Sequence, residues 1–274
     1  MPIARLPQLE LHYVRQGGGE PLLMIMGMSG THLHWGEPFR AELERDFDVI
    51  AYDHRGVGQS SRVEAPFTIS ELADDAAGLM DALELESAHV MGISMGGMVA
   101  QELVLRHPER VRTLALGCTY AGGPGSSLTG QDVISELSSS MLSGDRERAI
   151  RTAWEVNVSP AFAIGQATYE TFADIARQLP VAVPVIMAQA QAVGGHDTSA
   201  RLPEIRVPTL VIHGTEDRML PVGNAQVIAR AIPGARLEVM AGVGHLFFWE
   251  EPERSAALVR ELTGVPVSSS APPR

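Results

Sequence analysis

Lysine is absent from this chain of 274 residues, in which arginine and histidine are the only basic side chains. Schiff-base chemistry and a serine–lysine dyad both require a lysine amine, so neither can operate here. Cysteine is nearly absent too. Cys118 stands alone, which excludes a disulfide within the chain and gives no sign of an oxidising compartment.

Positive charge is also scarce. The formal net charge is -12, and an acidic surface argues against nucleic acid as a partner, because phosphate binding needs clustered cations. Long apolar runs are lacking as well: residues 22–26 are far short of the roughly 20 needed to cross a membrane. The first residues carry Pro2, Arg5 and Pro7 and lack the apolar segment of a secretory signal. We expect a cytoplasmic protein without a membrane partner; a homo-oligomer stays open.

Short apolar runs alternate with helical periodicity along most of the chain. Strands are predicted at residues 9–14, 21–26, 47–52, 88–93, 111–116, 207–212 and 236–240, and helices at 35–45, 69–83, 95–106, 223–231 and 252–262. Thr68 and Ser70 are both possible N-caps of the 69–83 helix. This alternation predicts an α/β fold with a mostly parallel sheet and helices on both faces.

Residues 122–202 break the alternation, because they show helical periodicity and no convincing strand. An insertion of this length is a unit of its own rather than a loop. We predict a core of residues 1–121 and 203–264, a helical cap at 122–202 and a disordered tail at 265–274. Ligands bind at the carboxyl ends of strands in open α/β sheets, where this segment emerges, which favours a cap over a bundle that only adds stability.

The candidate nucleophile is Ser94, in the sequence G-I-S-M-G at residues 92–96. The motif follows a predicted buried strand and opens a predicted helix, which is the strand–turn–helix setting of a nucleophile elbow. The serine needs a strained backbone to project its Oγ, and side chains at Gly92 and Gly96 would collide with the neighbouring strand and helix. An incidental serine in a glycine-rich turn is the alternative.

An acyl-transfer site also needs two main-chain N–H groups that point at the oxyanion. One should come from Met95, directly after the nucleophile. The other should come from the loop after the predicted 21–26 strand, where Met28 follows the strand-ending Gly27 and Ser29 is the alternative.

The candidate base is His245, in the glycine-rich loop G-V-G-H that follows the last predicted strand. Its acid should lie between Ser94 and His245 in chain order. Asp217, in the loop after the 207–212 strand, is our choice, and Glu216 is its rival. Asp53 also ends a strand but precedes the nucleophile, so we interpret it as structural. The histidines and aspartates show no metal-ligand spacing, so we expect neither a metal nor a cofactor.

Together these features resemble the α/β-hydrolase superfamily from about residue 9 to residue 262. The resemblance rests on five pieces in the expected order: the turn at Gly27, D-H-R-G-V-G-Q-S at 53–60, G-I-S-M-G-G at 92–97, G-T-E-D at 214–217 and G-H at 244–245. It implies a Ser94–Asp217–His245 triad and a lid at 122–202. It also implies a serine hydrolase that cleaves an ester through an acyl-enzyme.

Within the superfamily, the sequence is similar to small bacterial carboxylesterases, 3-oxoadipate enol-lactonases and methyl esterases of polyketide pathways. Carbon–carbon bond hydrolases and cofactor-free haloperoxidases or perhydrolases share much of it. Serine at 94 argues against haloalkane dehalogenases and soluble epoxide hydrolases, which use aspartate there. Many members have His-Gly at the oxyanion turn; here Met26 precedes Gly27, which keeps the backbone donor and loses a polar contact. Some relatives keep the triad yet act mainly as ligand receptors.

The expected substrate is a small, largely apolar ester or lactone. Trp35, Trp154 and Phe162 are the predicted substrate-binding residues, although such side chains are often core instead. Further apolar candidates near the site or in the cap are Met28, Met95, Phe172, Val185, Ile186 and Met187. A lactonase for a carboxylated substrate would need an inward arginine, for which Arg146, Arg148, Arg151, Arg177 and Arg201 are candidates.

Overall fold

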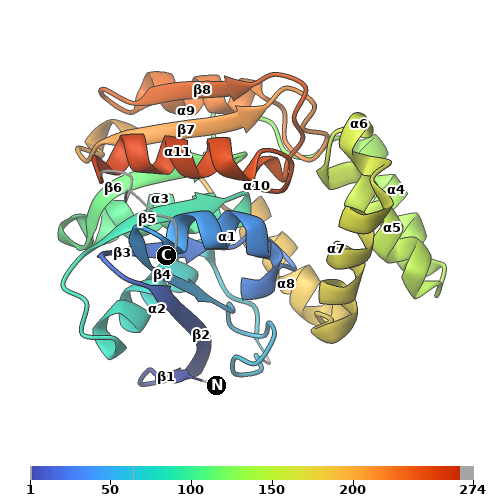
Figure 1. Ribbon diagram of the computed structural model, residues 1–274, viewed down its shortest axis with the longest axis horizontal. Coiled ribbons are helices and arrows are strands. Elements are labelled where there is room, and N and C mark those ends of the chain that lie inside the picture. The colour runs from blue at the N-terminus through green and yellow to red at the C-terminus, as the bar shows by residue number, and fades with distance from the viewer. Residues whose placement is uncertain (1, 64, 266–274) are drawn as a thin grey trace, which may run out of the picture.

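An eight-stranded sheet runs through the centre of the computed structural model, which describes residues 2–63 and 65–265 (Figure 1). The spatial order is β1-β2-β4-β3-β5-β6-β7-β8. The strands are β1 (Ile3–Arg5), β2 (Glu10–Gly17), β3 (Glu20–Ile25), β4 (Phe47–Tyr52), β5 (Ala88–Ile93), β6 (Val111–Gly117), β7 (Thr209–Gly214) and β8 (Arg236–Met240). The β1–β2 and β2–β4 pairings are antiparallel and the other five are parallel, which confirms the predicted mostly parallel sheet.

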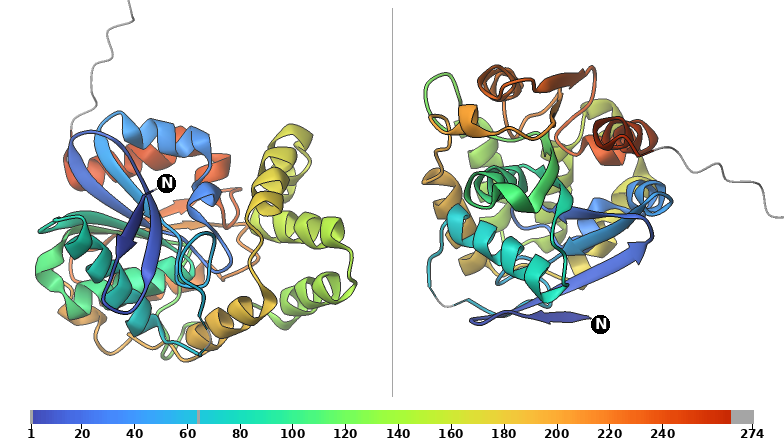
Figure 2. Two further views of the ribbon diagram at one scale, coloured as in Figure 1. Left: turned by 90° about the horizontal axis from the view of Figure 1, so that it is seen from below. Right: turned by 90° about the vertical axis from the view of Figure 1, so that its left-hand side faces the viewer.

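Helices cover both faces of the sheet, as Figure 2 shows. One face packs against α1 (Glu37–Glu44), α10 (Phe247–Glu250) and α11 (Pro252–Thr263), and the other against α2 (Ile69–Ala82), α3 (Met95–Arg106) and α9 (Gly223–Ala231). β5 lies between β3 and β6, and all six of its residues are buried, as expected of a parallel strand covered on both faces. The motif that follows β5 therefore starts from the most rigid part of the core.

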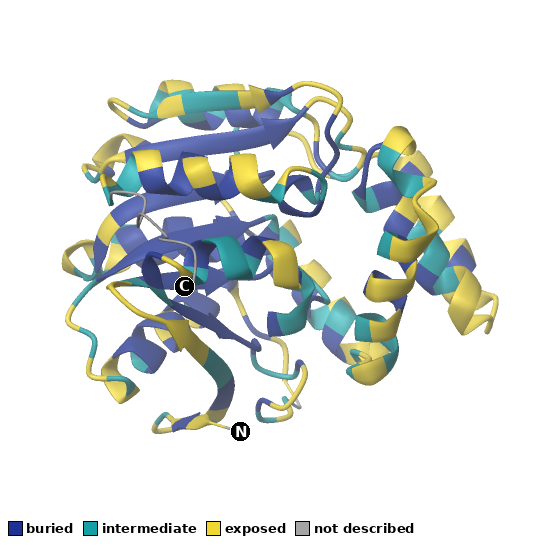
Figure 3. Cartoon of the chain, viewed as in Figure 1, coloured by how far each residue is buried: buried dark blue, intermediate teal, exposed yellow. Residues whose placement is uncertain are grey.

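Five helices stand between β6 and β7. They are α4 (Gln131–Leu142), α5 (Arg146–Asn157), α6 (Pro160–Ala163), α7 (Gln166–Gln178) and α8 (Val183–Gly194), followed by the short η3 (Leu202–Glu204). Figure 1 shows α4 to α7 beyond the edge of the sheet to which the arrowhead of β7 points. Figure 3 shows that these helices carry far more exposed surface than the strands do. No strand occurs in residues 122–202, all of which the structure describes.

Several element boundaries differ from the predictions. The helix predicted at 35–45 is divided at Gly36, whose φ of 71° separates the short η1 (His32–Trp35) from α1. β7 begins at Thr209, two residues later than predicted, and β1 and α10 were not predicted. At α2 the structure selects Thr68 over Ser70 as the N-cap: the Thr68 hydroxyl accepts from the Glu71 N–H and the Glu71 carboxylate accepts from the Thr68 N–H.

Among the described residues, no single helix has the length and apolar character needed to cross a membrane. Only α7 and α8 taken together, with a bend of 105° between them, meet that measure of length and composition. Apart from Val265, the tail predicted to be disordered lies outside the described residues.

Candidate active site

Ser94 occupies a strained turn between β5 and α3. Its φ of 56° and ψ of −123° are unfavourable for a residue with a side chain. Hydrogen bonds hold the turn in place: the Ser94 N–H donates to Gly117 O at 2.9 Å, and the Thr119 hydroxyl donates to Ser94 O at 2.7 Å. Ser94 is partly exposed while its neighbours from Met91 to Met98 are buried, so this turn presents the serine outward from the core.

The two glycines of the motif are required by space. A Cβ at Gly92 would come within 2.2 Å of Gly96 O, and a Cβ at Gly96 would come within 2.0 Å of Ile25 O. Both approaches are far shorter than any van der Waals contact between these atoms. The glycines therefore let α3 begin directly against β3 and β5, which is the crowding inferred from the motif.

The loop after β3 passes beside Ser94. A Cβ at Gly27 would lie 3.1 Å from Ser94 Cβ and 3.7 Å from its Oγ. Among the described residues, no hydrogen bond engages the main-chain N–H of Met28 or of Met95. The Ser29 N–H, by contrast, donates to Gln189 Oε1 at 3.0 Å. Of the two oxyanion donors considered in this loop, Met28 is thus the one whose N–H has no acceptor among the described residues.

Asp217 and His245 meet at the ends of β7 and β8. His245 Nδ1 lies 2.8 Å from Asp217 Oδ2, and both side chains are buried. An ionised carboxylate only accepts, so Nδ1 carries the proton and Nε2 stays free to act as a base. The rival Glu216 is exposed, and its N–H donates to Val243 O at 2.9 Å. The structure therefore pairs the predicted base with Asp217.

Close packing at Gly214, the last residue of β7, makes this meeting possible. A Cβ at Gly214 would lie 2.1 Å from Val243 O, so the loop after β7 packs directly on the loop that carries His245. Glu250 of α10 then ties the histidine loop to the inserted helices, because its carboxylate accepts from the Gly244 N–H and from the Ser159 N–H, each at 2.8 Å. The position of His245 thus depends on contacts from both the core and the insertion.

His213 is a member of this cluster that the sequence analysis did not single out. Its side chain is fully buried at the end of β7, and its Nε2 lies 2.9 Å from Asp217 Oδ2 and 2.9 Å from Leu220 O. Both are acceptors, so Nε2 carries the proton. Asp217 Oδ1 meanwhile accepts from the main-chain N–H groups of Met219 and Leu220. The spacing of His213 and Asp217, four residues apart after a strand, was a signal that could have suggested the contact.

These donors determine the charge of Asp217. Burial raises the pKa of its carboxyl, but the positive charge on His245 and the hydrogen bonds from His213 and His245 outweigh that effect, and the pKa lies well below its usual value. Asp217 therefore remains an anion whenever His245 takes up a proton, which is what an orienting acid requires.

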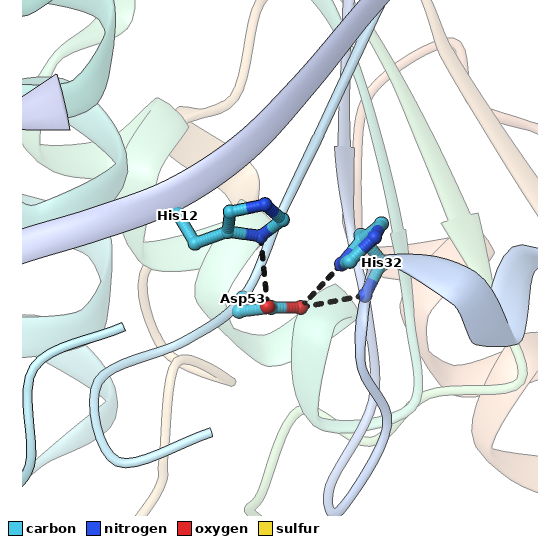
Figure 4. A group of neighbouring side chains, drawn as sticks. All are labelled: His12, His32 and Asp53. Atoms are coloured by element: carbon cyan, nitrogen blue, oxygen red, sulfur yellow. Dashed lines mark hydrogen bonds and ion pairs between the residues drawn. The ribbon is translucent and has the colours of Figure 1, made fainter. Parts of the chain in front are cut away.

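A second buried carboxylate, Asp53, joins two histidines, His12 and His32 (Figure 4). Its Oδ2 lies 3.0 Å from His12 Nδ1, and its Oδ1 lies 2.9 Å from His32 Nδ1 and accepts from the His32 N–H at 2.8 Å. The Gln59 N–H donates to Oδ2 at 3.2 Å. Burial raises the pKa of Asp53, yet the hydrogen bonds from His32 lower it further than burial raises it.

The three side chains of this second cluster could in principle hold a metal ion, since their ligand atoms lie within 4.8 Å of one another. However, each Asp53 oxygen already accepts two hydrogen bonds, and both Nδ1 atoms act as donors. A metal would have to displace these protons and the hydrogen bonds that they make to Asp53. Asp53 instead braces the loops at residues 27–32 and 53–60, in agreement with the structural role inferred for it.

Cys118, Asp217 and His245 form another group of possible ligand atoms. Burial, together with the negative charge of Asp217, raises the pKa of the Cys118 thiol well above its usual value. The sulfur therefore carries its proton in the free protein.

The fold and these sites can be compared with known proteins. Residues 22–258 match the model of the alpha/beta hydrolase family. The chain belongs to this family. The hydrolase is 31% identical over 256 residues to "Putative carbamate hydrolase RutD" of Azorhizobium caulinodans, and the match covers 92% of this chain and 94% of the relative.

Solved structures agree with this assignment. A hydrolase from Pseudomonas aeruginosa PA01 superimposes with a TM-score of 0.83 at 28% identity, covering 96% of this chain and 98% of its own. The enol-lactonase from Burkholderia xenovorans LB400 gives a TM-score of 0.82 at 26% identity, covering 96% and 100%. The predicted α/β-hydrolase fold is therefore confirmed, and the protein is a hydrolase.

A cavity on another side of this hydrolase does not contain the proposed catalytic residues. It measures about 500 Å³, lies between α2, α3 and α8, and is lined by Phe67, Thr68, Glu102 and His196 among others. Most of its acidic groups already have partners, such as Glu102 with Arg201. The strained serine and the Asp217–His245 pair identify the candidate site better than cavity size does.

The predicted substrate-binding aromatics occupy different environments. Trp35 is fully buried and packs on Phe39 and Phe248 in the core. Trp154 of α5 is also buried and forms an aromatic cluster with Phe162, Tyr169, Phe172 and Trp249, which joins the inserted helices to α10. Phe162 is only partly buried. Contact of any of the three with substrate stays a prediction.

Other residues considered for the pocket are also accounted for. Val185 packs beside Gly56, whereas Met187 is 63% exposed. Of the five candidate arginines, four have partners within the protein: Arg146 with the carbonyls of Ala176 and Arg177, Arg151 with the ring of Tyr169, Arg177 with Glu147, and Arg201 with Glu102. Arg148 is exposed. None of these contacts directs an arginine toward Ser94.

Proposed function

We propose that the protein is a serine hydrolase that cleaves a carboxylic ester of a small, largely apolar molecule. His245 Nε2 takes the proton from Ser94 Oγ, which attacks the ester carbonyl and forms a tetrahedral intermediate. The Met28 and Met95 N–H groups stabilise its oxyanion. His245 then protonates the leaving alcohol, and afterwards activates the water that hydrolyses the acyl-enzyme.

The observation that carries this proposal is the commitment of His245 Nδ1 to Asp217 at 2.8 Å. That bond leaves Nε2 unprotonated, which makes the imidazole a base. The strained conformation of Ser94 adds support, because such strain persists only where surrounding structure holds it and it is common at active sites. The N–H groups of Met95, next to Ser94 in the chain, and of Met28, next to Gly27, have no acceptor among the described residues, as expected of oxyanion donors.

We further propose that residues 122–202 act as the cap over this site. The position of α4 to α7 beyond the strand ends supports that role (Figure 1). So do the contacts that α5, α7 and α8 make with α10 and the oxyanion loop. The aromatic side chains that these helices carry favour an apolar substrate.

A second candidate reaction is the cleavage of a carbamate by the same serine. The observation that favours it is the name of the Azorhizobium caulinodans relative, whose match spans nearly the whole of both chains. A carbamate carbonyl resembles an ester carbonyl in shape, and the proposed catalytic groups would act on it in the same order.

Kinetics with matched p-nitrophenyl substrates test these proposals. We expect the wild-type protein to hydrolyse p-nitrophenyl butyrate with a burst of acyl-enzyme formation, and Ser94→Ala to abolish turnover. A p-nitrophenyl N-methylcarbamate run in parallel shows whether the carbamate is turned over or only acylates the enzyme. A fluorophosphonate probe followed by mass spectrometry should label Ser94; labelling of another residue would refute the assignment.

A further inference from the structure

Gln189 of α8 is fully buried against the loop that carries the proposed oxyanion donor. Its Oε1 accepts from the main-chain N–H of Ser29, a residue 160 positions earlier in the chain. Because an N–H requires an acceptor, this contact fixes which end of the amide is oxygen. The Nε2 is therefore turned away from Ser29, and among the described residues it has no hydrogen-bond partner.

An unpaired amide donor in such a place needs an explanation. Buried side-chain donors are almost always hydrogen-bonded, because a buried donor without a hydrogen bond costs free energy. A glutamate could accept from Ser29 without presenting a donor, and a methionine would fill similar volume without any polar group. Because none of the described residues accepts from this N–H, it is open to an acceptor that the chain itself does not supply.

The location of Gln189 suggests where that acceptor comes from. Ser29 follows Met28 directly, and the same loop passes within van der Waals distance of Ser94 at Gly27. Ser29 itself has a φ of 63°, so the Gln189 contact stabilises a strained residue and is itself held rigidly by it. α8 belongs to the inserted segment, so the amide reaches the oxyanion loop from the side of the proposed cap.

We infer that Gln189 Nε2 donates a hydrogen bond to the substrate, and that the enzyme prefers esters whose acyl chain carries an acceptor oxygen beyond the reacting carbonyl. This inference rests on the serine-hydrolase function proposed above. The anchored Oε1 fixes the donor before binding, so little side-chain entropy is lost when the acceptor arrives. A neutral hydrogen bond of this kind changes kcat/KM by about 3- to 10-fold.

Three pairs of p-nitrophenyl esters test the preference. Each pair replaces one methylene by an ether oxygen: methoxyacetate against butyrate, 3-methoxypropanoate against pentanoate, and 4-methoxybutanoate against hexanoate. The ratio of kcat/KM within each pair is divided by the ratio of the hydroxide-catalysed rates, which removes intrinsic reactivity. We expect at least one pair to show an excess of about 3- to 10-fold for the ether in the wild-type enzyme.

Two variants then test whether the preference for the ether ester comes from the Gln189 amide. Gln189→Met removes the whole amide, and Gln189→Glu, measured at a pH of about 8 where a free carboxyl is ionised, keeps an oxygen for the Ser29 N–H and removes the donor. Both should reduce the normalised ratio to about one, whereas Gln191→Met, at an exposed position of the same helix, should leave it unchanged.

Three results would overturn the inference. One is a wild-type enzyme without any excess, a second is an excess that persists in Gln189→Met, and a third is a loss in both Gln189 variants that is equal for ether and alkyl esters. The third would make Gln189 only a brace for the loop. Turnover that survives in Ser94→Ala would instead refute the proposed serine mechanism, so the two failures are distinguishable.

Discussion

Replacing Asp217 by asparagine should abolish most of the activity while preserving the shape of the site. The Asp217 Oδ1 accepts two main-chain N–H groups, those of Met219 and Leu220 at 2.8 and 2.9 Å. These donors cannot change, so an asparagine must place its oxygen there and turn its NH2 toward His213 and His245. The His245 Nδ1 then becomes an acceptor, its proton moves to Nε2, and the imidazole cannot deprotonate Ser94.

The expected loss in kcat is about 10⁴-fold, the effect of a wrong histidine tautomer in a serine triad. This corresponds to about 5 kcal/mol of transition-state stabilisation. The assay is the hydrolysis of p-nitrophenyl butyrate under steady-state and single-turnover conditions, with circular dichroism to verify that Asp217→Asn is folded. The matched control is Glu216→Gln, which alters the exposed neighbouring carboxylate and should retain wild-type kcat.

Two results would refute this reasoning. A folded Asp217→Asn variant that retains a tenth or more of the wild-type kcat would show that Asp217 does not determine the tautomer of His245. An equal loss in Glu216→Gln would show that the acid has been assigned to the wrong residue.

Two further predictions concern histidines outside the proposed triad. His213→Leu should lower kcat by about tenfold, because it removes one hydrogen bond to the charged Asp217 carboxylate. His213→Gln, whose amide can reach the same oxygen, should recover part of that loss. Equal kcat in the two variants would argue against a positioning role for His213. Burial lowers the pKa of His196 from 6.5 to about 4. Between these two pH values the unfolded chain binds a proton at His196 and the folded chain does not, so the free energy of unfolding falls as the pH drops from 6.5 toward 4, by roughly 3 kcal/mol at most. Urea unfolding across this pH range measures that loss, and His196→Gln should flatten the slope; an unchanged slope would contradict the assignment.

Local sequence patterns were enough to predict the turn at Ser94 and the elements on either side of it. The strand before Ser94, the helix after it and the two glycines depend on neighbours close in the chain, and the close contacts at Gly92 and Gly96 agree with the crowding inferred from the motif. Chain order then placed Asp217 and His245 at adjacent strand ends. Adjacent parallel strands bring their carboxyl ends together, so this pairing could be expected without knowledge of side-chain contacts.

Contacts between distant segments could not be predicted in this way. The bond from Ser29 to Gln189 depends on how α8 settles on the sheet, and a glutamine in an amphipathic helix carries no signal of that placement. The short β1 and α10 were missed because three or four residues contain too little periodicity to detect. The division of the 35–45 helix depends on the positive φ of Gly36, where a Cβ would also lie only 3.2 Å from the Trp249 ring.

Two strained serines, Ser29 and Ser94, link the inserted helices to the proposed catalytic groups. A φ near 60° at a residue with a side chain costs free energy, and each residue keeps it through hydrogen bonds from elsewhere. Ser94 is held by Gly117 and Thr119 of the core. Ser29 is held by Gln189 of α8, so displacement of that helix would release the loop that carries Met28. In the proposed mechanism such a displacement would disturb the Met28 donor and leave the Met95 donor in place, which would couple the position of the proposed cap to the reactivity of Ser94.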